Sequence, residues 1–317
     1  MRSNPLAGRA GAWLIYLVVL GGIIGGLYVA TQRIDYSWNW QRIPQYLISN
    51  EGQERVAPFD GFVAVAEDGH SLTLKEMKGS RSITIRDFDE LLVGDGDLVF
   101  ENDPLARKRG LVAGPLLVGL WMTLKISALS LMAALVLGLL IGLGRVSRNS
   151  AVSGLAATYV EVIRGTPLLV QIFIFYFFVG TVMELSAFTA GVAALAVFTA
   201  AYVAEIIRAG IEAVPRGQME AARSLGLSLP QAMRHVILPQ AFKRTLPPLA
   251  GQFINLIKDS SLVSVMALTD LTKAGREVVS STFSPFEVWF TVAGMYLLLT
   301  GLLSYLVRRL EKRLAHD

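Results

Sequence analysis

Long apolar segments recur along the chain, and their lengths are typical of membrane-crossing helices. A helix needs about 20 apolar residues to cross a hydrocarbon core of about 30 Å. These runs are longer than the strands of a membrane barrel, and no other element satisfies its backbone in lipid. We therefore expect an all-α polytopic membrane protein with about six spans, at residues 12–30, 119–143, 168–183, 188–207, 246–266 and 288–307.

Two of the predicted spans are irregular. The third is extended backward by the less apolar residues 151–163. The fifth contains Pro247 and Pro248 and includes the polar run 258–261. Because proline removes a backbone donor and clashes with the preceding turn, we expect the fifth span to be broken.

Residues 1–30 are predicted to form an N-terminal anchor helix. A secretory signal peptide is the alternative, because Arg2 and Arg9 make a basic start. The apolar run is long for a signal peptide, and Tyr28-Val29-Ala30 is a poor cleavage site. A retained anchor is therefore favoured.

Lysine and arginine predict the orientation, because loops on the cytoplasmic side carry an excess of positive charge. With the N-terminus inside, the inside segments hold 15 of these residues and the short outside loops, 184–187 and 267–287, hold 2. We therefore expect both termini to be cytoplasmic.

Residues 31–110 then form one long extracytoplasmic segment. Turn pairs such as Asp60-Gly61 and Asp68-Gly69 separate short runs of alternating polarity, at 62–65, 71–74, 82–85 and 98–100. This pattern predicts a small antiparallel β-rich insert at about 51–109.

Composition argues against several kinds of protein and site. The chain has 317 residues, of which 53% are hydrophobic and 17% charged, which excludes disorder and disfavours an ordinary soluble domain. It has no cysteine, and its three histidines are scattered, so neither suggests a metal site. The net charge of +4 lies beside apolar segments, which disfavours nucleic acid. A cluster of acidic residues could bind calcium, but its spacing departs from the EF-hand pattern, so a solvated face is favoured. These residues are Asp95, Asp97, Glu101 and Asp103.

The segment that follows the fourth predicted span has its own pattern. We expect a short helix over 217–225, a turn at Gly226 and a second short helix over 230–237. Pro239 is expected to force a break before the fifth span. A rigid amphipathic elbow outside the membrane is a docking element for a soluble partner. The alternative is an amphipathic hairpin that lies on the lipid headgroups.

The run from Glu220-Ala221-Ala222 through Gly226 and Val236 to Leu238-Pro239 has a distinctive spacing. With these residues the segment resembles the EAA loop of ABC importer permeases. Three further runs resemble the polar amino-acid branch of that family, at 159–169, 204–208 and 256–262. The resemblance covers about 111–317, which is the expected permease core with its coupling loop at 215–240. The β-rich insert departs from it.

The resemblance implies a type I ABC importer-like permease of the bacterial cytoplasmic (inner) membrane, which moves an amino acid or related small polar solute inward. Such permeases work with a second permease subunit, the same or a different chain, and each EAA loop docks in a separate ABC ATPase subunit. An extracytoplasmic solute-binding protein delivers the substrate. Because the chain has no G-x-x-x-x-G-K-[ST] motif, we expect ATP and Mg to be bound by the ATPase. No catalytic residue, cofactor or metal is expected in this chain.

Candidate residues fall into three roles. Those for ATPase coupling are Glu220, Ala221, Ala222, Leu225, Gly226, Met233, Val236, Leu238 and Pro239. Polar groups are costly within spans, so those present are expected to line a substrate path or to make interhelical contacts. The candidates are Gln171, Gln252, Asn255, Lys258, Asp259 and Ser260. Glu205 and Arg208 are one helical turn apart and are expected to form a structural ion pair. Glu220 is expected to fix the elbow by an ion pair or a helix N-terminal contact, or else to be solvated.

Two other classes of function stay open on the sequence alone. The first is an ATP-independent secondary transporter or channel, although no internal repeat is evident and the elbow then has no role. The second is a membrane anchor whose β-rich insert acts as a sensor. Association with an ATPase distinguishes the leading interpretation from both.

Overall fold

The structure, a computed structural model, describes residues 5–34, 36–49, 52–66, 71–77 and 79–314. The expected turn pair Asp68-Gly69, residues 1–4 of the expected anchor and Glu51 of the expected insert lie outside the described residues. The chain divides into two compact units, 1–41 and 42–317, and each is described by itself.

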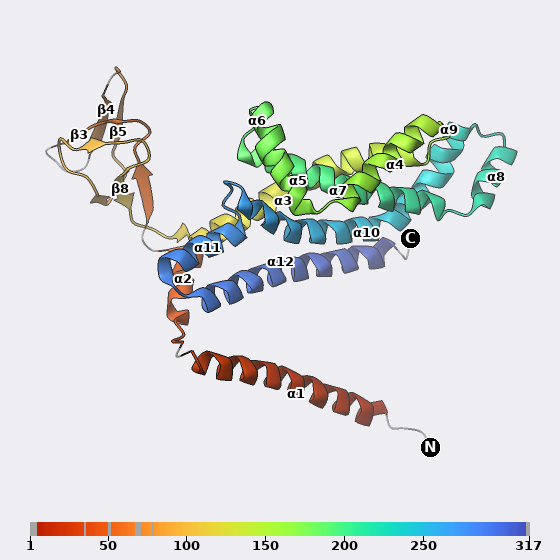
Figure 1. The fold of residues 1–317 in the computed structure, drawn as a ribbon, viewed down its shortest axis with the longest axis horizontal. Helices are drawn as coiled ribbons and strands as arrows, with labels where there is room; N and C mark the ends of the chain where they lie inside the picture. The colour runs from red at the N-terminus through yellow and green to blue at the C-terminus, as the bar shows by residue number, and fades with distance from the viewer. Residues whose placement is uncertain (1–4, 35, 50–51, 67–70, 78, 315–317) are drawn as a thin grey trace. The chain divides into compact units, whose positions relative to one another are not determined.

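Helix α1 (Pro5–Gln32) is the main element of the first unit (Figure 1). Its run Trp13–Gln32 is long and apolar enough to cross a membrane. Large apolar side chains, such as Trp13 and Val18, are exposed along this run. Apolar side chains on all sides of a helix are typical of a membrane span.

The second unit begins with the end of the 3₁₀ turn η1 (Trp40–Arg42), helix α2 (Ile43–Leu47) and a set of short strands. All strand pairings are antiparallel, in the orders β5-β4-β3-β7, β2-β8-β6 and β1-β9. Alternate residues of β3 and β4 are buried, and Val63, Leu72 and Leu74 join Leu105 in one core. The strands are β1 (Ile48–Ser49), β2 (Gln53–Val56), β3 (Gly61–Val65), β4 (Leu72–Glu76), β5 (Ser82–Ile85), β6 (Glu90–Leu91), β7 (Leu98–Val99), β8 (Pro104–Lys108) and β9 (Val112–Ala113).

Helices make up the rest of the second unit (Figure 1). Two of the segments, η2 and η3, are π-helical, and η4 is a 3₁₀ turn. In chain order the elements are α3 (Pro115–Arg145), α4 (Ser150–Gly165), α5 (Leu168–Phe173), η2 (Ile174–Val179), α6 (Gly180–Val182), α7 (Ala187–Glu212), α8 (Arg216–Ser224), α9 (Leu229–Ala232), η3 (Met233–Ile237), α10 (Leu238–Asp259), η4 (Ser260–Val265), α11 (Leu271–Thr282) and α12 (Pro285–Leu314).

Within the described residues, four helices are long and apolar enough to cross a membrane, where six spans were predicted. They lie at Trp13–Gln32, Pro115–Arg145, Ala187–Glu212 and Pro285–Arg309. A fifth results if α4 and the segment Leu168–Val182 count as one bent pair. The predicted span at 246–266 is not among them, because α10 carries many polar residues, including Gln240, Lys243, Arg244, Gln252, Asn255, Lys258 and Asp259.

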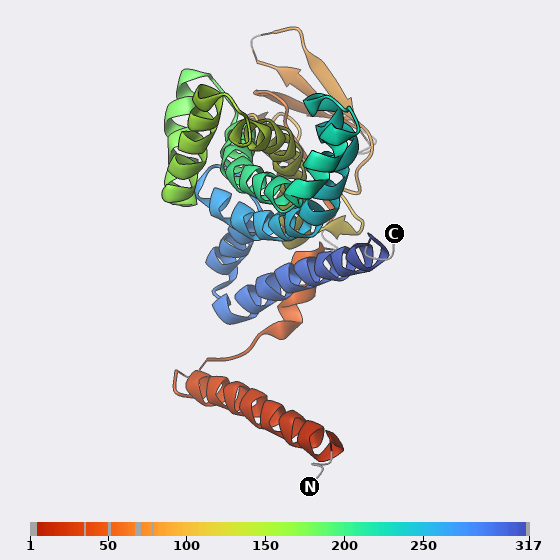
Figure 2. The ribbon, with the colours of Figure 1, turned by 90° about the vertical axis from the view of Figure 1, so that its right-hand side faces the viewer.

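Helix α7 is the central helix of this unit and contacts α3, α4, α5, η2 and α10 (Figure 2). It lies very close to α3, because glycine at 138 leaves room for it. A Cβ atom at Gly138 would lie 2.5 Å from the Cβ atom of Val203 and 2.9 Å from the carbonyl oxygen of Ala200. Small residues at an interface let membrane helices approach in this way.

The third predicted span is bent at its start. Helix α4 and the segment Leu168–Val182 meet at 104°. Thr166 and Pro167 are extended between them, with ψ values of 143° and 137°, since the residue before a proline avoids the helical region. Residues 151–163 therefore lie in a separate helix and do not extend this span in a straight line.

The prolines of α10 do not interrupt it. Pro247 and Pro248 lie inside α10, and Pro239 lies in its first turn, directly after the π-helical η3. A π turn shifts the hydrogen-bond register, which accommodates a residue that has no N–H. The expected break at Pro239 is therefore wrong. The α-helix ends at Asp259, within the polar run, where η4 begins.

Candidate functional site

The elbow, residues 215–240, turns at a glycine that ends α8. Gly226 has a φ of +84°. The Leu227 N–H donates to the carbonyl of Ala222 at 3.2 Å, and the Gly226 N–H donates to that of Arg223 at 3.0 Å. This pair of bonds is the Schellman pattern of helix termination. A capping box at Ser228 then starts α9, so local hydrogen bonds set both sides of the turn.

One hydrogen bond within the elbow and one between α10 and the end of α7 hold the elbow in place. The Gln240 side-chain amide donates to Gln218 of α8 at 3.2 Å, and the Arg244 guanidinium donates to the carbonyl of Ala213 at 2.6 Å. Beneath these bonds lies a small apolar core, whose buried residues are Val214, Ile237 and Ala241. The elbow is therefore packed onto the helix ends.

The predicted coupling residues divide between the surface and the core of the elbow. Leu225 exposes 83% of its surface. Ala221 is exposed, whereas Ala222 is buried within the elbow. The remaining members are the half-buried Met233, Val236 and Leu238 and the exposed Pro239. The elbow thus combines a packed frame with an apolar side chain that no described residue covers.

Glu220 differs from its expected role. Its side chain is exposed and forms no hydrogen bond or ion pair with any residue that the structure describes. Helix α8 begins at Arg216, and its free N–H groups are those of the first turn. Glu220 lies beyond that turn. The Schellman turn and the Gln218–Gln240 bond hold the elbow instead.

Glu205 and Arg208 of α7 form an ion pair. The Arg208 Nε atom donates to a Glu205 carboxylate oxygen at 3.0 Å, and Arg208 also pairs with Glu212. Arg145, at the end of α3, lies 3.6 Å from Glu205. The pair is therefore part of a network that joins the ends of α3 and α7.

The candidates for the substrate path separate into two places. Gln252, Asn255, Lys258 and Asp259 follow one another along α10, and the next residue, Ser260, is buried with its hydroxyl bonded to the carbonyl of Ile257 at 2.8 Å. Gln171 lies apart on α5 and is also buried. Its amide donates to the carbonyl of Ile163 at 2.8 Å and to the hydroxyl of Thr166 at 2.7 Å, across the α4–α5 bend.

Gln171→Leu is expected to loosen this bend and to lower the thermal stability of the protein. The change removes the hydrogen bonds to Ile163 and Thr166, and each typically contributes about 0.5–1.5 kcal/mol. The midpoint of thermal unfolding in detergent measures the effect. Gln252→Leu on α10 is the matched control, and an equal drop in both variants would contradict the role in the bend.

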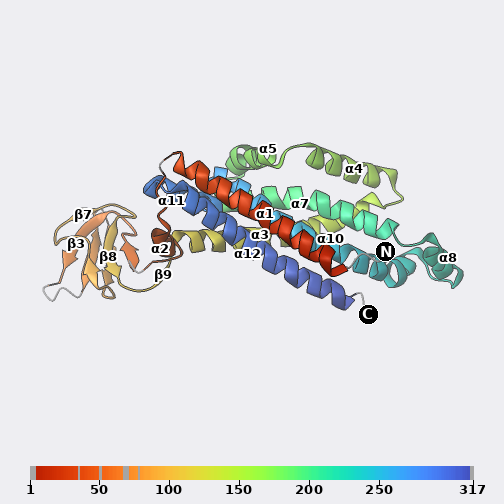
Figure 3. The ribbon, with the colours of Figure 1, turned by 90° about the horizontal axis from the view of Figure 1, so that it is seen from below.

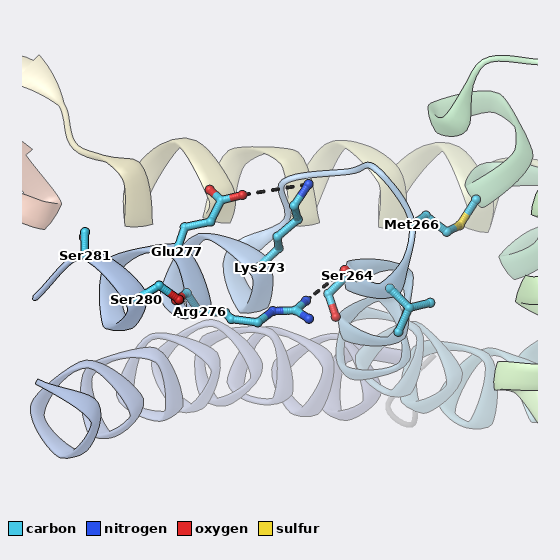
Figure 4. Close-up of a pocket in the computed structure, with 8 residues that line it drawn as sticks. Ser264, Met266, Lys273, Arg276, Glu277, Ser280 and Ser281 are labelled. Atoms are coloured by element: carbon cyan, nitrogen blue, oxygen red, sulfur yellow. Dashed lines mark hydrogen bonds and ion pairs between the residues drawn. The ribbon is translucent and has the colours of Figure 1, made fainter. Parts of the chain in front are cut away.

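A pocket of about 660 Å³ lies between η4 and α11 (Figure 4). The Arg276 guanidinium donates to the carbonyl of Ser264 at 2.9 Å, and the Lys273 ammonium lies 3.8 Å from the carboxylate of Glu277. Lys273 and Arg276 entered the predicted topology only as loop charges. The signal for this pocket in the sequence is their spacing of three residues, which places them on neighbouring turns of one helix.

Asp270 fixes the start of α11 beside this pocket. Its carboxylate accepts from the N–H groups of Thr272 at 3.1 Å and Lys273 at 2.9 Å. Burial raises the pKa of the Asp270 carboxyl, although these two bonds oppose the shift. The N–H of Leu271, the residue after Asp270, donates to the Thr123 hydroxyl of α3 at 3.1 Å. The N-terminal end of α11, called the α11 end below, is therefore anchored to α3.

Helix α10 connects the elbow with this pocket. It begins directly after η3 and ends directly before η4, and the views in Figure 1 and Figure 3 place α8 and α11 near its opposite ends. Its 22 residues correspond to about 33 Å at 1.5 Å per residue. One continuous helix therefore joins the elbow to η4, which borders the pocket.

Comparison with known proteins gives consistent matches. Residues 134–316 match the family model described as binding-protein-dependent transport system inner membrane component. The probable glutamine ABC transporter permease protein GlnM of Bacillus subtilis (strain 168) is 46% identical over 197 residues, which are 62% of this chain and 91% of the relative. The glutamine transport system permease protein GlnP of Escherichia coli (strain K12) is 42% identical over 204 residues, or 63% and 93%.

A solved structure agrees with these relatives. The crystal structure of an amino acid ABC transporter with histidines contains a chain that is 45% identical and superposes with a TM-score of 0.60. The match covers 63% of this chain and 94% of that one. The protein thus has the type I ABC importer permease fold.

The family match and the helices together establish the class of protein. The matched residues 134–316 are more than half of the chain and include α7, the elbow, α10 and α11. The long apolar helices agree with a multi-pass inner-membrane protein, and the relatives are transporter subunits and not enzymes. The chain therefore belongs to the binding-protein-dependent transport system inner membrane component family, as an ABC importer permease of the polar amino-acid branch.

Proposed function

We propose that this permease imports an amino acid, with glutamine as the first candidate, and that ATP hydrolysis on a separate ABC ATPase subunit drives the transport. The names of two relatives, at 46% and 42% identity, support glutamine. The observation that carries the coupling role is the elbow, because its frame is packed against α7 and α10 while Leu225 is 83% exposed. ATP and Mg are bound by the ATPase.

The two ends of α10 have different partners in this proposal. The elbow docks in the ATPase on the cytoplasmic side, where the excess of lysine and arginine also predicts both termini. The α11 end then faces outward, and the solute-binding protein delivers the amino acid there. A second permease subunit, the same or a different chain, completes the path. The polar residues along α10, from Gln252 to Asp259, line the path between the two ends.

Co-reconstitution tests this proposal. The permease is placed in liposomes with a candidate ATPase and a glutamine-binding protein, and uptake and ATP hydrolysis are measured together. We expect glutamine to stimulate both, and we expect neither when the ATPase is left out. Uptake that follows an ion gradient without ATP, or a failure to associate with any ATPase, would overturn the proposal.

A further inference from the structure

A second polar cavity lies where α3, α4 and α7 meet, away from the elbow and from the pocket of Figure 4. Its volume is about 390 Å³, and sites for small molecules usually measure about 300–1,000 Å³. Charged and aromatic side chains from all three helices meet there. The lining residues that matter below are Arg145, Glu161, Arg164, Gly165, Tyr202 and Glu205.

The cavity holds cationic donors that the described chain does not use. The Arg164 guanidinium lies 5.2 Å from the ring centroid of Tyr202 and makes no hydrogen bond or ion pair with a described residue. The Nε atom of Arg145 is buried and has no hydrogen-bond partner among the described residues. Buried donors in native proteins are nearly always paired. The guanidinium groups of Arg145 and Arg164 both line the cavity, and such groups bind carboxylates and phosphates.

The two carboxylates of the cavity differ in their availability. Glu205 is already held by Arg208 and lies 3.6 Å from Arg145. Glu161 is exposed, and its side chain forms no hydrogen bond or ion pair with a described residue. It precedes Arg164 by three residues on α4, so the two side chains lie on neighbouring turns of the same face. Arg164 and Glu161 thus lie next to each other, and neither side chain forms a hydrogen bond or ion pair with a described residue.

We propose that this cavity binds a zwitterion, whose oxyanion contacts Arg164 and Arg145 and whose ammonium group contacts Glu161. The lining has two cationic and two anionic side chains, and this balance favours a zwitterion over a simple anion. Two kinds of molecule carry the required pair of groups. A free amino acid offers a carboxylate and an ammonium, and a phosphatidylethanolamine headgroup offers a phosphate and an ammonium.

A single cysteine gives a direct readout of occupancy. The chain contains no cysteine, so Gly165→Cys creates one labelling site. A Cβ atom at Gly165 meets no atom within 4 Å, so there is open space at the point where the cysteine side chain begins. The full chain is reconstituted in nanodiscs, and the rate of alkylation of this cysteine by N-ethylmaleimide is measured. One arm adds glutamine to phosphatidylglycerol nanodiscs, and the other uses phosphatidylethanolamine nanodiscs without an amino acid.

We expect at least one arm to slow alkylation by about tenfold once the ligand is about tenfold above its Kd. The arm that protects identifies the source of the zwitterion. In the Arg164→Gln background the affinity is expected to fall by roughly tenfold or more, because a charge-assisted hydrogen bond is lost. Arg148→Gln is the matched control: it makes the same change of charge in the exposed turn between α3 and α4, and protection is expected to persist.

Three results would overturn the proposal. They are the absence of protection in both arms, unchanged protection in the Arg164→Gln background, and protection by glutarate, which has no ammonium group, equal to that by glutamine. Alkylation requires neither ATP hydrolysis nor a partner subunit. A failure here is therefore distinguishable from a failure of ATP-driven uptake.

Discussion

Replacing Gly226 with valine is expected to lower ATP-driven uptake by about tenfold or more, while the chain still inserts into the membrane. Gly226 has a φ of +84°, a region that costs L-residues about 1–2 kcal/mol and that β-branched residues rarely adopt. A free energy of 1.4 kcal/mol is a factor of about ten in an equilibrium. The backbone must leave this conformation, and the two bonds of the Schellman turn are lost with it.

The environment of Gly226 makes this a test of backbone conformation alone. A Cβ atom there meets no other atom within 4 Å, so the added Cβ atom causes no steric clash. Gly226→Asn is the matched control, because asparagine visits the left-handed region readily. We expect near-normal uptake for asparagine and a loss for valine in co-reconstituted liposomes, at equal amounts of inserted permease. Equal uptake by the two variants would show that the shape of the elbow does not set coupling.

The features that the sequence predicts well are those made by neighbours along the chain. The turn at Gly226 follows from one glycine after a short amphipathic run, because its hydrogen bonds join residues 222–227. The ion pair of Glu205 and Arg208 follows from a spacing of one helical turn. Both features involve a single helix end or face, so the local pattern contains all the information they require.

The features that it predicts poorly depend on partners far away in the chain or on small backbone adjustments. Residues 151–163 and 168–183 form adjacent apolar stretches, and the 104° angle between them depends on the extended Thr166-Pro167 link, which Gln171 bridges. Pro239 follows a π turn that no composition rule indicates. The zwitterion cavity combines α3, α4 and α7, so its arginines and its glutamate become neighbours only in the folded chain.

Replacing Gly138 with alanine is expected to lower the free energy of unfolding of the helices from α3 to α12 by about 1–3 kcal/mol, the usual cost of overpacking a tight interface. The added Cβ atom would lie 2.5 Å from the Cβ atom of Val203 and 2.9 Å from the carbonyl oxygen of Ala200. Neither of these atoms is the end of a flexible side chain, so α3 and α7 must move apart. Since α7 also contacts α4, α5 and α10, the shift reaches the cavity and the elbow.

The same substitution at Gly294, inside α12, is expected to have the opposite sign. A Cβ atom there meets no atom within 4 Å, and alanine favours a helix over glycine by about 0.8–1.0 kcal/mol. Thermal unfolding in detergent compares the two variants. If the close contact at Gly138 limits the approach of α7, then Gly138→Ala should cost less stability in a Val203→Gly background than in the natural sequence, because the nearest Cβ atom is then absent. Equal stability of the two alanine variants would mean that α3 and α7 are not in close contact at this point.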